Sequence, residues 1–139
     1  MTMSIRGKEI EWSYLYVANI PFELPDLNSY NKASRSTYGK ILANNIKQKT
    51  QRDILFCLPA KQKPLLTPVR ASFFWTVKDK RKDPDNIAFA VKFIFDALVK
   101  KGILYDDNLN KVAEIHHYFR VDRKDVGVTV MLETTESAK

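Results

Sequence analysis

Between residues 69 and 121, the spacing of hydrophobic residues changes from that of a strand to that of a helix and back to that of a strand. This order of spacings restricts the chain to folds that combine helices with a sheet. In residues 69–77, apolar side chains alternate with others, which is typical of a strand with one rich core face. Residues 87–101 place apolar side chains three or four positions apart, which predicts an amphipathic helix. Alternation returns in residues 113–121. We therefore expect a strand, a helix and a second strand at the centre of the fold.

Three flanking segments extend this pattern. Residues 12–20 alternate and are rich in aromatics, so they predict a first strand. Residues 30–56 have helical spacing, and residues 126–132 predict a last strand. The polar residues 122–125 before that last strand suggest a hairpin. The predicted order is β-α-β-α-β-β, an α/β (α+β) fold with a mixed four-stranded sheet and two main helices.

Composition sets the size and the environment. A chain of 139 residues with 45% hydrophobic residues predicts one globular domain over 1–139, with flexible ends at 1–11 and 134–139. The single Cys57 excludes an internal disulfide and fits a reducing, cytoplasmic setting. No apolar run is long enough to span a membrane, and the first eleven residues lack the apolar region of a signal peptide.

Two groups of aspartates stand out against a net charge of +7. Asp83 and Asp85 precede the predicted helix of residues 87–101, and Asp106 and Asp107 follow it. Oxygen ligands are what hard cations such as Mg²⁺ prefer, so we expect the four carboxylates to converge on a metal. The positive net charge predicts attraction to nucleic acid or to an anionic membrane. A basic surface around an acidic metal site is typical of phosphodiester chemistry on nucleic acid.

Simpler interpretations exist for each aspartate alone. One aspartate at the start of the helix would serve as a cap, and the pair after the helix would form a polar turn. For Asp96 we favour a surface ion pair with Lys92, four residues earlier on the helix. Taken together, however, several like charges packed closely are costly unless a cation neutralises them. This cost favours the metal interpretation.

The region from residue 69 to residue 130 resembles the RusA family of Holliday-junction resolvases. The family pattern is a basic run, Asp-x-Asp-Asn, a helix with a lysine and Asp-Ala-Leu, and then a glycine and a closing Asp-Asp. The matching residues here are Arg81-Lys82, Asp83-Pro84-Asp85-Asn86, Lys92, Asp96-Ala97-Leu98, Gly102 and Asp106-Asp107.

The resemblance implies a function as well as a fold. Members of this family are small, basic, homodimeric, Mg²⁺-dependent endonucleases, often encoded by phages, that nick two opposed strands of a four-way DNA junction in recombination and repair. For this chain, the resemblance implies Mg²⁺ as cofactor, with Mn²⁺ as a substitute, and no nucleotide cofactor. It implies catalytic roles for Asp83, Asp85, Asp107 and Lys92, with Asp106 as an additional metal ligand.

The lysine departs from the family pattern. In the best-known form of the family the lysine follows the second aspartate of the motif by four residues, and Phe89 holds that position here. Lys92 follows Asp85 by seven residues. Both spacings return to the same face of a regular helix, so the resemblance assigns the lysine role to Lys92. Phe89 and Phe93 lie off the main apolar stripe, and we expect them to pack on the first helix rather than in a dimer contact.

Basic residues near these motifs are candidates for contact with the DNA backbone. They are Arg70, Lys78, Lys80, Arg81 and Lys82, with Lys40 and Lys47 on the first helix. Two other functions stay open. The chain would be either a related nuclease that acts on flaps or forks, or a catalytically silent protein that binds branched DNA. His116 and His117 are adjacent on a strand and point to opposite faces, so they do not form a two-histidine metal site.

Overall fold

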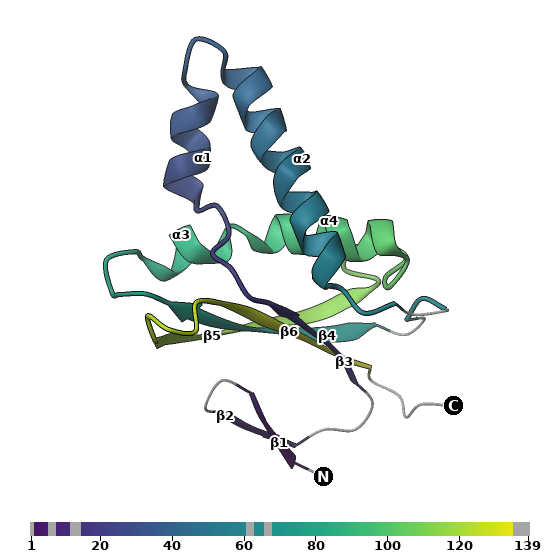
Figure 1. Ribbon diagram of the computed structural model, residues 1–139. Helices are drawn as coiled ribbons and strands as arrows, with labels where there is room; N and C mark the ends of the chain where they lie inside the picture. The colour runs from purple at the N-terminus through teal and green to yellow at the C-terminus, as the bar shows by residue number, and fades with distance from the viewer. Residues whose placement is uncertain (1, 6–7, 12–14, 61–62, 66–67, 135–139) are drawn as a thin grey trace.

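A four-stranded sheet carries all the helices on one face (Figure 1). The structure is a computed structural model that describes residues 2–5, 8–11, 15–60, 63–65 and 68–134. Its mixed α and β composition and its mixed four-stranded sheet confirm the predicted fold class.

The strand order decides which loops share an end of the sheet. The strands are β3 (Leu15–Ile20), β4 (Val69–Val77), β5 (Val112–Val121) and β6 (Gly127–Thr134), in the order β3-β6-β4-β5. Strand β6 is antiparallel to β3 and β4, whereas β4 and β5 are parallel. Strands β3, β4 and β5 therefore run the same way, and we call the edge where they finish the carboxyl end. Residues 12–14 of the predicted first strand lie outside the described residues.

The expected hairpin at residues 122–125 is not formed. Strand β4 lies between β5 and β6, so these residues cross its end instead of joining two paired strands. The backbone N–H of Asp122 donates to the carbonyl of Val77, the last residue of β4, at 2.9 Å. Strand β4 is central and has six consecutive buried residues, because both of its faces are covered. Phe73 and Trp75 face the helices, and Phe74 packs with Met131 on the other face.

The long helix expected at residues 30–56 is two helices, α1 (Leu27–Ser34) and α2 (Gly39–Cys57). The chain reverses so tightly between them that a Cβ built at Gly39 would lie 1.9 Å from the carbonyl oxygen of Ser34. Only glycine avoids that clash, so Gly39 permits the reversal. The two helices form a hairpin that projects from the sheet (Figure 1).

The helix expected at residues 87–101 is also divided, into α3 (Pro84–Ala88) and α4 (Val91–Lys101). Backbone hydrogen bonds between residues three positions apart join the two helices. In one of them, the N–H of Lys92 donates to the carbonyl of Phe89 at 3.3 Å. The Phe89 and Phe93 rings lie 5.4 and 6.0 Å from the ring of Tyr30 on α1. Their expected packing on the first helix is confirmed. Gly102 ends α4 with a φ of 82°, as the sequence predicts.

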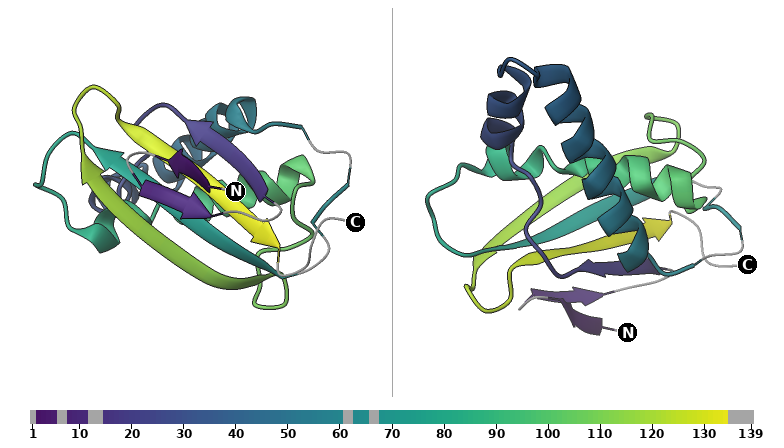
Figure 2. Two further views of the ribbon diagram at one scale, coloured as in Figure 1. Left: turned by 90° about the horizontal axis from the view of Figure 1, so that it is seen from below. Right: turned by 45° about the horizontal axis from the view of Figure 1, so that its top comes forward.

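A small antiparallel sheet of β1 (Thr2–Ile5) and β2 (Lys8–Glu11) occupies the N-terminal segment that we expect to be flexible. It lies on the side of the main sheet away from the helices (Figures 1 and 2). At the other end, Thr134 closes β6, and residues 135–139 are outside the described residues. None of the described helices has the length and apolar character needed to cross a bilayer.

The packing predicts a large effect of Phe73→Ala. Phe73 is fully buried, and its ring centroid lies 5.6 Å from that of Phe95 on α4. We expect the substitution to lower the free energy of unfolding by about 3–5 kcal/mol, because it leaves a cavity under the helices. Urea denaturation measures this, with Phe56→Ala as the control because Phe56 is 90% exposed. Equal losses in the two variants would contradict this position of the core.

Candidate nucleic-acid interface

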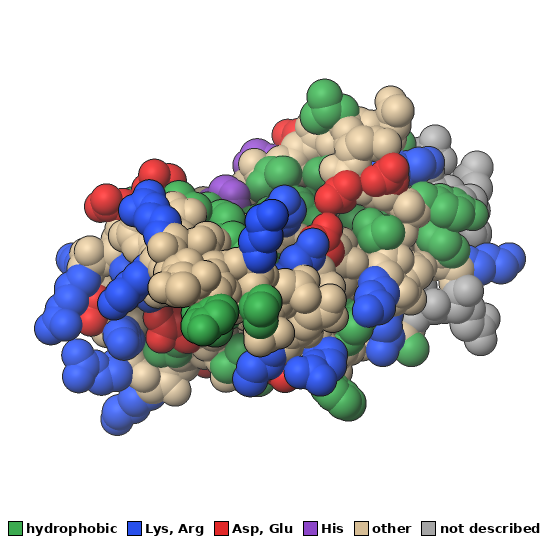
Figure 3. Space-filling view, turned by 90° about the horizontal axis from the view of Figure 1, so that it is seen from above, with side chains coloured by type: hydrophobic (Ala, Val, Ile, Leu, Met, Phe, Trp, Pro, Cys, Tyr) green, Lys and Arg blue, Asp and Glu red, His purple; other side chains and the backbone are tan. Residues whose placement is uncertain are grey.

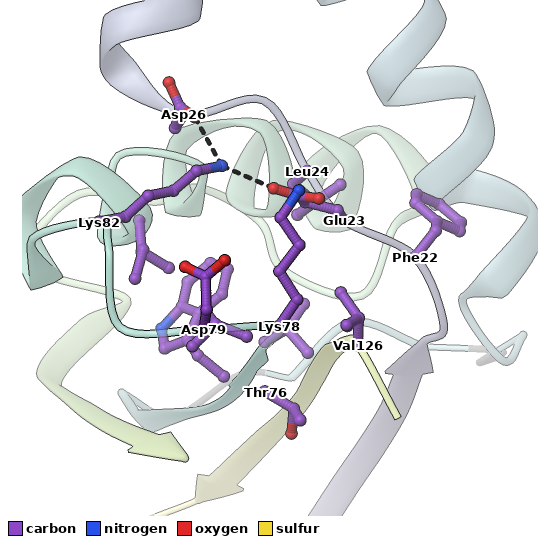
Figure 4. Close-up of a pocket in the computed structure, with 14 residues that line it drawn as sticks. Phe22, Glu23, Leu24, Asp26, Thr76, Lys78, Asp79, Lys82 and Val126 are labelled. Atoms are coloured by element: carbon purple, nitrogen blue, oxygen red, sulfur yellow. Dashed lines mark hydrogen bonds and ion pairs between the residues drawn. The ribbon is translucent and has the colours of Figure 1, made fainter. Parts of the chain in front are cut away.

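Three loops meet at the carboxyl end of the sheet (Figure 4). They are residues 21–26 after β3, residues 78–83 after β4 and residues 122–126 before β6. A hollow of about 40 Å³ between them has an apolar floor that includes Trp75 and Val128 and a charged rim. That volume suits a few water molecules and is too small for a nucleotide. Any large ligand would therefore bind across the surface of this end.

Lys82 joins two of these loops. Its Nζ lies 2.6 Å from Oε1 of Glu23 and 2.7 Å from Oδ2 of Asp26 (Figure 4). Burial by itself would raise the pKa of Asp26, but hydrogen bonds from Lys82 and Ser29 outweigh burial and lower it. Burial would lower the pKa of Lys82, but its two carboxylate partners raise it. Lys82 is thus occupied in holding the loops together, which the sequence does not reveal.

Asn86 provides a second attachment between α1 and the segment that follows β4. The N–H of Asn28, in the first turn of α1, donates to Oδ1 of the buried Asn86 at 2.9 Å. Asp26 caps α1 by accepting from the N–H of Ser29 at 2.7 Å. The segment that carries Asp83 and Asp85 is therefore fixed to α1 on both sides, through Lys82 and through Asn86.

The carboxylates of Asp83 and Asp85 point to solvent. Both residues are exposed. Asp83 occupies the N-cap position of α3 with an extended backbone, but its side chain makes no capping hydrogen bond. Its main-chain carbonyl instead accepts from the N–H groups of Asn86 and Ile87, at 3.1 and 3.2 Å. The simple capping interpretation therefore does not apply to the Asp83 side chain, and its carboxylate remains available to a ligand.

The second aspartate pair lies at the opposite end of the sheet. Helices α3 and α4 run back along the sheet so that β5 can start beside the beginning of β4. Asp106 and Asp107 follow α4, so they are a strand's length away from Asp83 and Asp85. Asp106 accepts from the N–H of Asp107 at 2.8 Å and from Nδ2 of Asn108 at 3.1 Å, as in a polar turn. The structure does not bring the four carboxylates together within one chain.

The described residues accordingly contain no group of three or more His, Cys, Asp or Glu side chains that could hold a metal ion. The length of the connecting helix explains why the expected convergence does not occur. Residues at the two ends of a helix are separated by its length, and α4 alone, with 11 residues, rises about 16 Å.

Lys92 is exposed near the start of α4. The expected alignment of Lys92 with Asp85 assumes one regular helix. Asp85 and Lys92 instead lie on two separate helices, α3 and α4, which the tight turn at residues 89–90 joins. The expected Lys92–Asp96 ion pair is not formed in the described chain, and Asp96 accepts a hydrogen bond from Nε2 of Gln51 on α2 at 3.2 Å.

Exposed basic side chains gather at the carboxyl end. Lys78, Lys80 and Arg81 are exposed in the loop after β4. Arg123 and Lys124 are exposed in the neighbouring turn and were missed in the sequence, where the polar residues 122–125 indicated only a connection. Figure 3 shows the Lys and Arg side chains crowded at this end, on the left of the view.

Asp79 shows that the two basic loops are electrostatically coupled. The N–H of Arg81 is the main cause of the lowered pKa of Asp79, and it donates to Oδ1 at 2.9 Å. The positive charges of Lys78 and of Arg123, across the gap between the loops, lower this pKa further. The residues of both loops thus form one positively charged surface next to Asp83 and Asp85.

The other predicted DNA contacts are dispersed. Arg70 lies near the start of β4, and its Nε donates to Oε2 of Glu114 at 2.9 Å. Lys40 is exposed near the start of α2, and Lys47 is half-buried farther along that helix. These three residues do not adjoin the surface formed by the loops at the carboxyl end.

Sequence comparison adds no family assignment. No protein-family model matches this chain, and no curated protein matches it in sequence. The geometry at the carboxyl end and the chemistry of its residues are therefore the basis for a functional proposal.

The ion pair of Asp26 predicts a pH effect on stability. Because the pKa of Asp26 is lower in the folded chain than the usual value of about 3.9, its stabilisation is complete at neutral pH and is lost as the pH falls through the folded pKa. Asp26→Asn keeps the cap but removes the charge. We expect the variant to be about 1 kcal/mol less stable at pH 7, with the difference disappearing in acid. Urea denaturation over a pH series measures this, and a pH-independent difference would contradict the assignment.

Proposed function

We propose that this protein is a Mg²⁺-dependent, structure-selective endodeoxyribonuclease that resolves four-way (Holliday) DNA junctions by paired nicks, in recombination and repair. One observation carries the proposal. Asp83 and Asp85 are exposed, the Asp83 side chain makes no capping hydrogen bond, and both residues adjoin a basic surface at the carboxyl end of the sheet. The resemblance to RusA resolvases in the same residues points to the same chemistry. A homodimer that works on DNA in the cytoplasm belongs to this proposal.

The donor set at this end fits Mg²⁺. Asp83 and Asp85 supply only oxygen ligands, and both carboxylates are exposed. Mg²⁺ retains several waters and is usually held by one or two carboxylates together with substrate phosphates. Two aspartates are therefore sufficient when DNA supplies the remaining oxygens. Bound there, Mg²⁺ would lower the pKa of a coordinated water and neutralise charge on the phosphate.

The protein's own residues would position the DNA. Asp83 and Asp85 are held by the Lys82 and Asn86 attachments, so their carboxylates would meet a phosphate with little loss of conformational freedom. Lys92 is exposed on the next helix and would contribute a point charge toward a neighbouring phosphate.

The basic loops would supply the affinity. Phosphate contacts from lysine and arginine fix the register of a protein on DNA without reading its sequence. Lys78, Lys80, Arg81, Arg123 and Lys124 are exposed at the same end of the sheet as the aspartates and would neutralise the DNA backbone near the cleaved bond. Selectivity for a junction would follow from the arrangement of two such surfaces in a dimer.

The central prediction concerns Asp85→Asn. We expect this variant to lose Mg²⁺-dependent cleavage of a synthetic mobile four-way junction, by about 100-fold or more, because the metal loses a charged ligand. Junction binding should persist or tighten, since the repulsion between carboxylate and phosphate is reduced. Gel analysis of nicks and a binding assay on the same samples measure the two effects.

Asp53→Asn is the matched control, because Asp53 pairs with Lys49 on α2 away from the basic surface. Full cleavage by Asp85→Asn would refute the metal-ligand role. Junction binding by the wild-type chain without any Mg²⁺-dependent nick would favour the silent DNA-binding alternative. Cleavage of flaps or forks in preference to junctions would favour the related nuclease.

A second prediction concerns the basic turn that the sequence did not indicate. Arg123→Gln should weaken binding to DNA of any sequence and reduce the slope of log affinity against log salt concentration by about 1, because one phosphate contact is lost. Arg52→Gln, an exposed position on α2, should leave the slope unchanged. A salt titration of binding by fluorescence anisotropy compares the two variants, and equal slopes would place the DNA elsewhere.

A further inference from the structure

The hairpin of α1 and α2 is attached at its base to the segment that follows β4. The N–H of Asn28 donates to the side chain of Asn86, and the ring of Tyr30 packs against that of Phe89 at the end of α3. Figure 1 shows both helices rising from these contacts away from the sheet. Residues 35–42 at the far end are exposed apart from the glycine of the turn. The hairpin therefore presents its far end to solvent while its base is held next to the aspartates.

The outer part of the hairpin carries positive charge only. Residues 27–47 contain no aspartate or glutamate, and their basic residues are Lys32, Arg35, Lys40 and Lys47. Farther along α2 the charges are balanced, since Nζ of Lys49 lies 2.7 Å from a carboxylate oxygen of Asp53. A surface with several cations and no carboxylates attracts a polyanion.

A shallow hollow along α1 has the same character. It has a volume of about 360 Å³ and contains no carboxylate. Its lining residues are Asn28, Asn31, Lys32, Arg35 and Ser36. Amide, hydroxyl and basic side chains are the groups that contact the phosphates and sugars of DNA. The hollow begins at Asn28, where α1 is attached to the segment that follows β4, and continues toward the far end of the hairpin.

Three large apolar side chains lie at that far end, where α2 begins. Tyr38, Ile41 and Leu42 are 68%, 61% and 42% exposed. Their spacing of three and four residues places them on one side of the helix. Figure 3 looks down on the hairpin and shows apolar side chains there among lysines and arginines. Large apolar side chains that gather in solvent mark an interaction surface.

We propose that the far end of the hairpin stacks on the open face of a base pair at a branch point of DNA, with Tyr38 as the stacking side chain. This inference rests on the proposed function and adds a source of structure selectivity that each chain carries by itself. The face of a base pair is a flat π-surface inside a polyanion, so it matches an apolar tip on a basic stem.

Linear duplex offers no such partner for the tip. Its base pairs are stacked on one another, and its outer surface consists of phosphates, sugars and the edges of bases in the grooves. At a branch point the stacking is interrupted, so an apolar side chain takes the place of the missing neighbour, as apolar wedges do at kinked base steps. The basic residues of the hairpin would therefore bind any duplex, whereas the tip would distinguish branched from linear DNA.

An anionic membrane also combines negative charge with apolar groups. DNA fits the hairpin better, because the basic side chains extend along α1 to its base and along α2 to Lys47. A membrane that received the tip would contact only the few residues around Tyr38.

Binding measured in EDTA tests the inference without any cleavage. We expect Tyr38→Ser to bind a four-way junction about tenfold more weakly than the wild-type chain, with unchanged affinity for a linear duplex of the same sequence. Tyr38→Phe keeps the ring and should bind as the wild type does. Phe56→Ser is the matched control, because Phe56 is an exposed ring near the other end of α2. Thermal unfolding checks that each variant folds. An equal loss on both DNAs in Tyr38→Ser, or no loss, would overturn the proposal.

Arg35→Gln and Lys40→Gln separate the effect of charge from that of stacking. Each should weaken junction and duplex by the same factor and reduce the slope of log affinity against log salt concentration by about 1, because phosphates are present in both DNAs. Slopes that neither variant changes would place the DNA away from the hairpin and overturn the proposal.

Fluorescence of 2-aminopurine reports the stacking itself. Placed beside the branch point, this base should change its emission when the wild-type chain or Tyr38→Phe binds, and should not respond to Tyr38→Ser. The same base in the middle of a junction arm is the control, since it remains stacked on both sides. Equal signals with Tyr38→Ser and the wild-type chain would overturn the role of Tyr38.

The inference and the proposed nuclease fail separately. Branch-selective binding that requires Tyr38, without any Mg²⁺-dependent nick by the wild-type chain, would refute the nuclease and leave the inference standing. Junction cleavage in which Tyr38→Ser keeps the wild-type affinity and rate would do the reverse. Binding to vesicles of anionic phospholipid that Tyr38→Ser abolishes, with unchanged binding to both DNAs, would assign the tip to a membrane surface instead.

Discussion

The parallel pairing of β4 and β5 determines which residues of this protein can act together. Parallel neighbours need a connection that returns along the whole sheet, and α3 and α4 form that connection. Whatever precedes the connection lies at the carboxyl end, and whatever follows it lies at the other end. Asp83 and Asp85 therefore share an end with the basic turn at residues 122–125, although nearly forty positions separate them in sequence, and they are separated from Asp106 and Asp107.

An ion pair and a hydrogen bond that are partly shielded from solvent fix the loops at the carboxyl end of the sheet. In the ion pair between Asp26 and Lys82, the two side chains are 10% and 32% exposed. Solvent therefore screens this pair less than the pair of Arg81 and Asp79, because the Arg81 side chain is 87% exposed. Asn86 adds a buried acceptor for the backbone of α1. The loop that carries Asp83 and Asp85 is consequently anchored at both sides, while its carboxylates stay in solvent. A rigid segment with free charged groups suits the binding of a large anionic ligand.

The sequence predicts the local elements better than their arrangement. Residues 69–77 form the predicted strand, because strong alternation and a dense apolar content leave few other structures. The division of the first helix depends on the approach of Gly39 to Ser34, and no proline indicates it. The second helix is divided at Phe89, whose ring packs against Tyr30 of α1, a residue far away in the sequence. The absent hairpin has the same origin, since alternation identifies strands but does not state which of them are neighbours. The aspartate motif was visible as residues, whereas the separation of its two halves follows only from the topology.

That separation and the exposed edge of β5 follow from the same strand order. Because β4 lies between β5 and β6, β5 is at the edge of the sheet, with Ile115, Phe119 and Val121 partly exposed. The crossover that precedes β5 also carries the second aspartate pair to the other end of the sheet. A Mg²⁺ ion held by Asp83 and Asp85 would therefore take its remaining oxygen ligands from water and DNA phosphate, and the basic residues of the neighbouring loops would hold that phosphate in place.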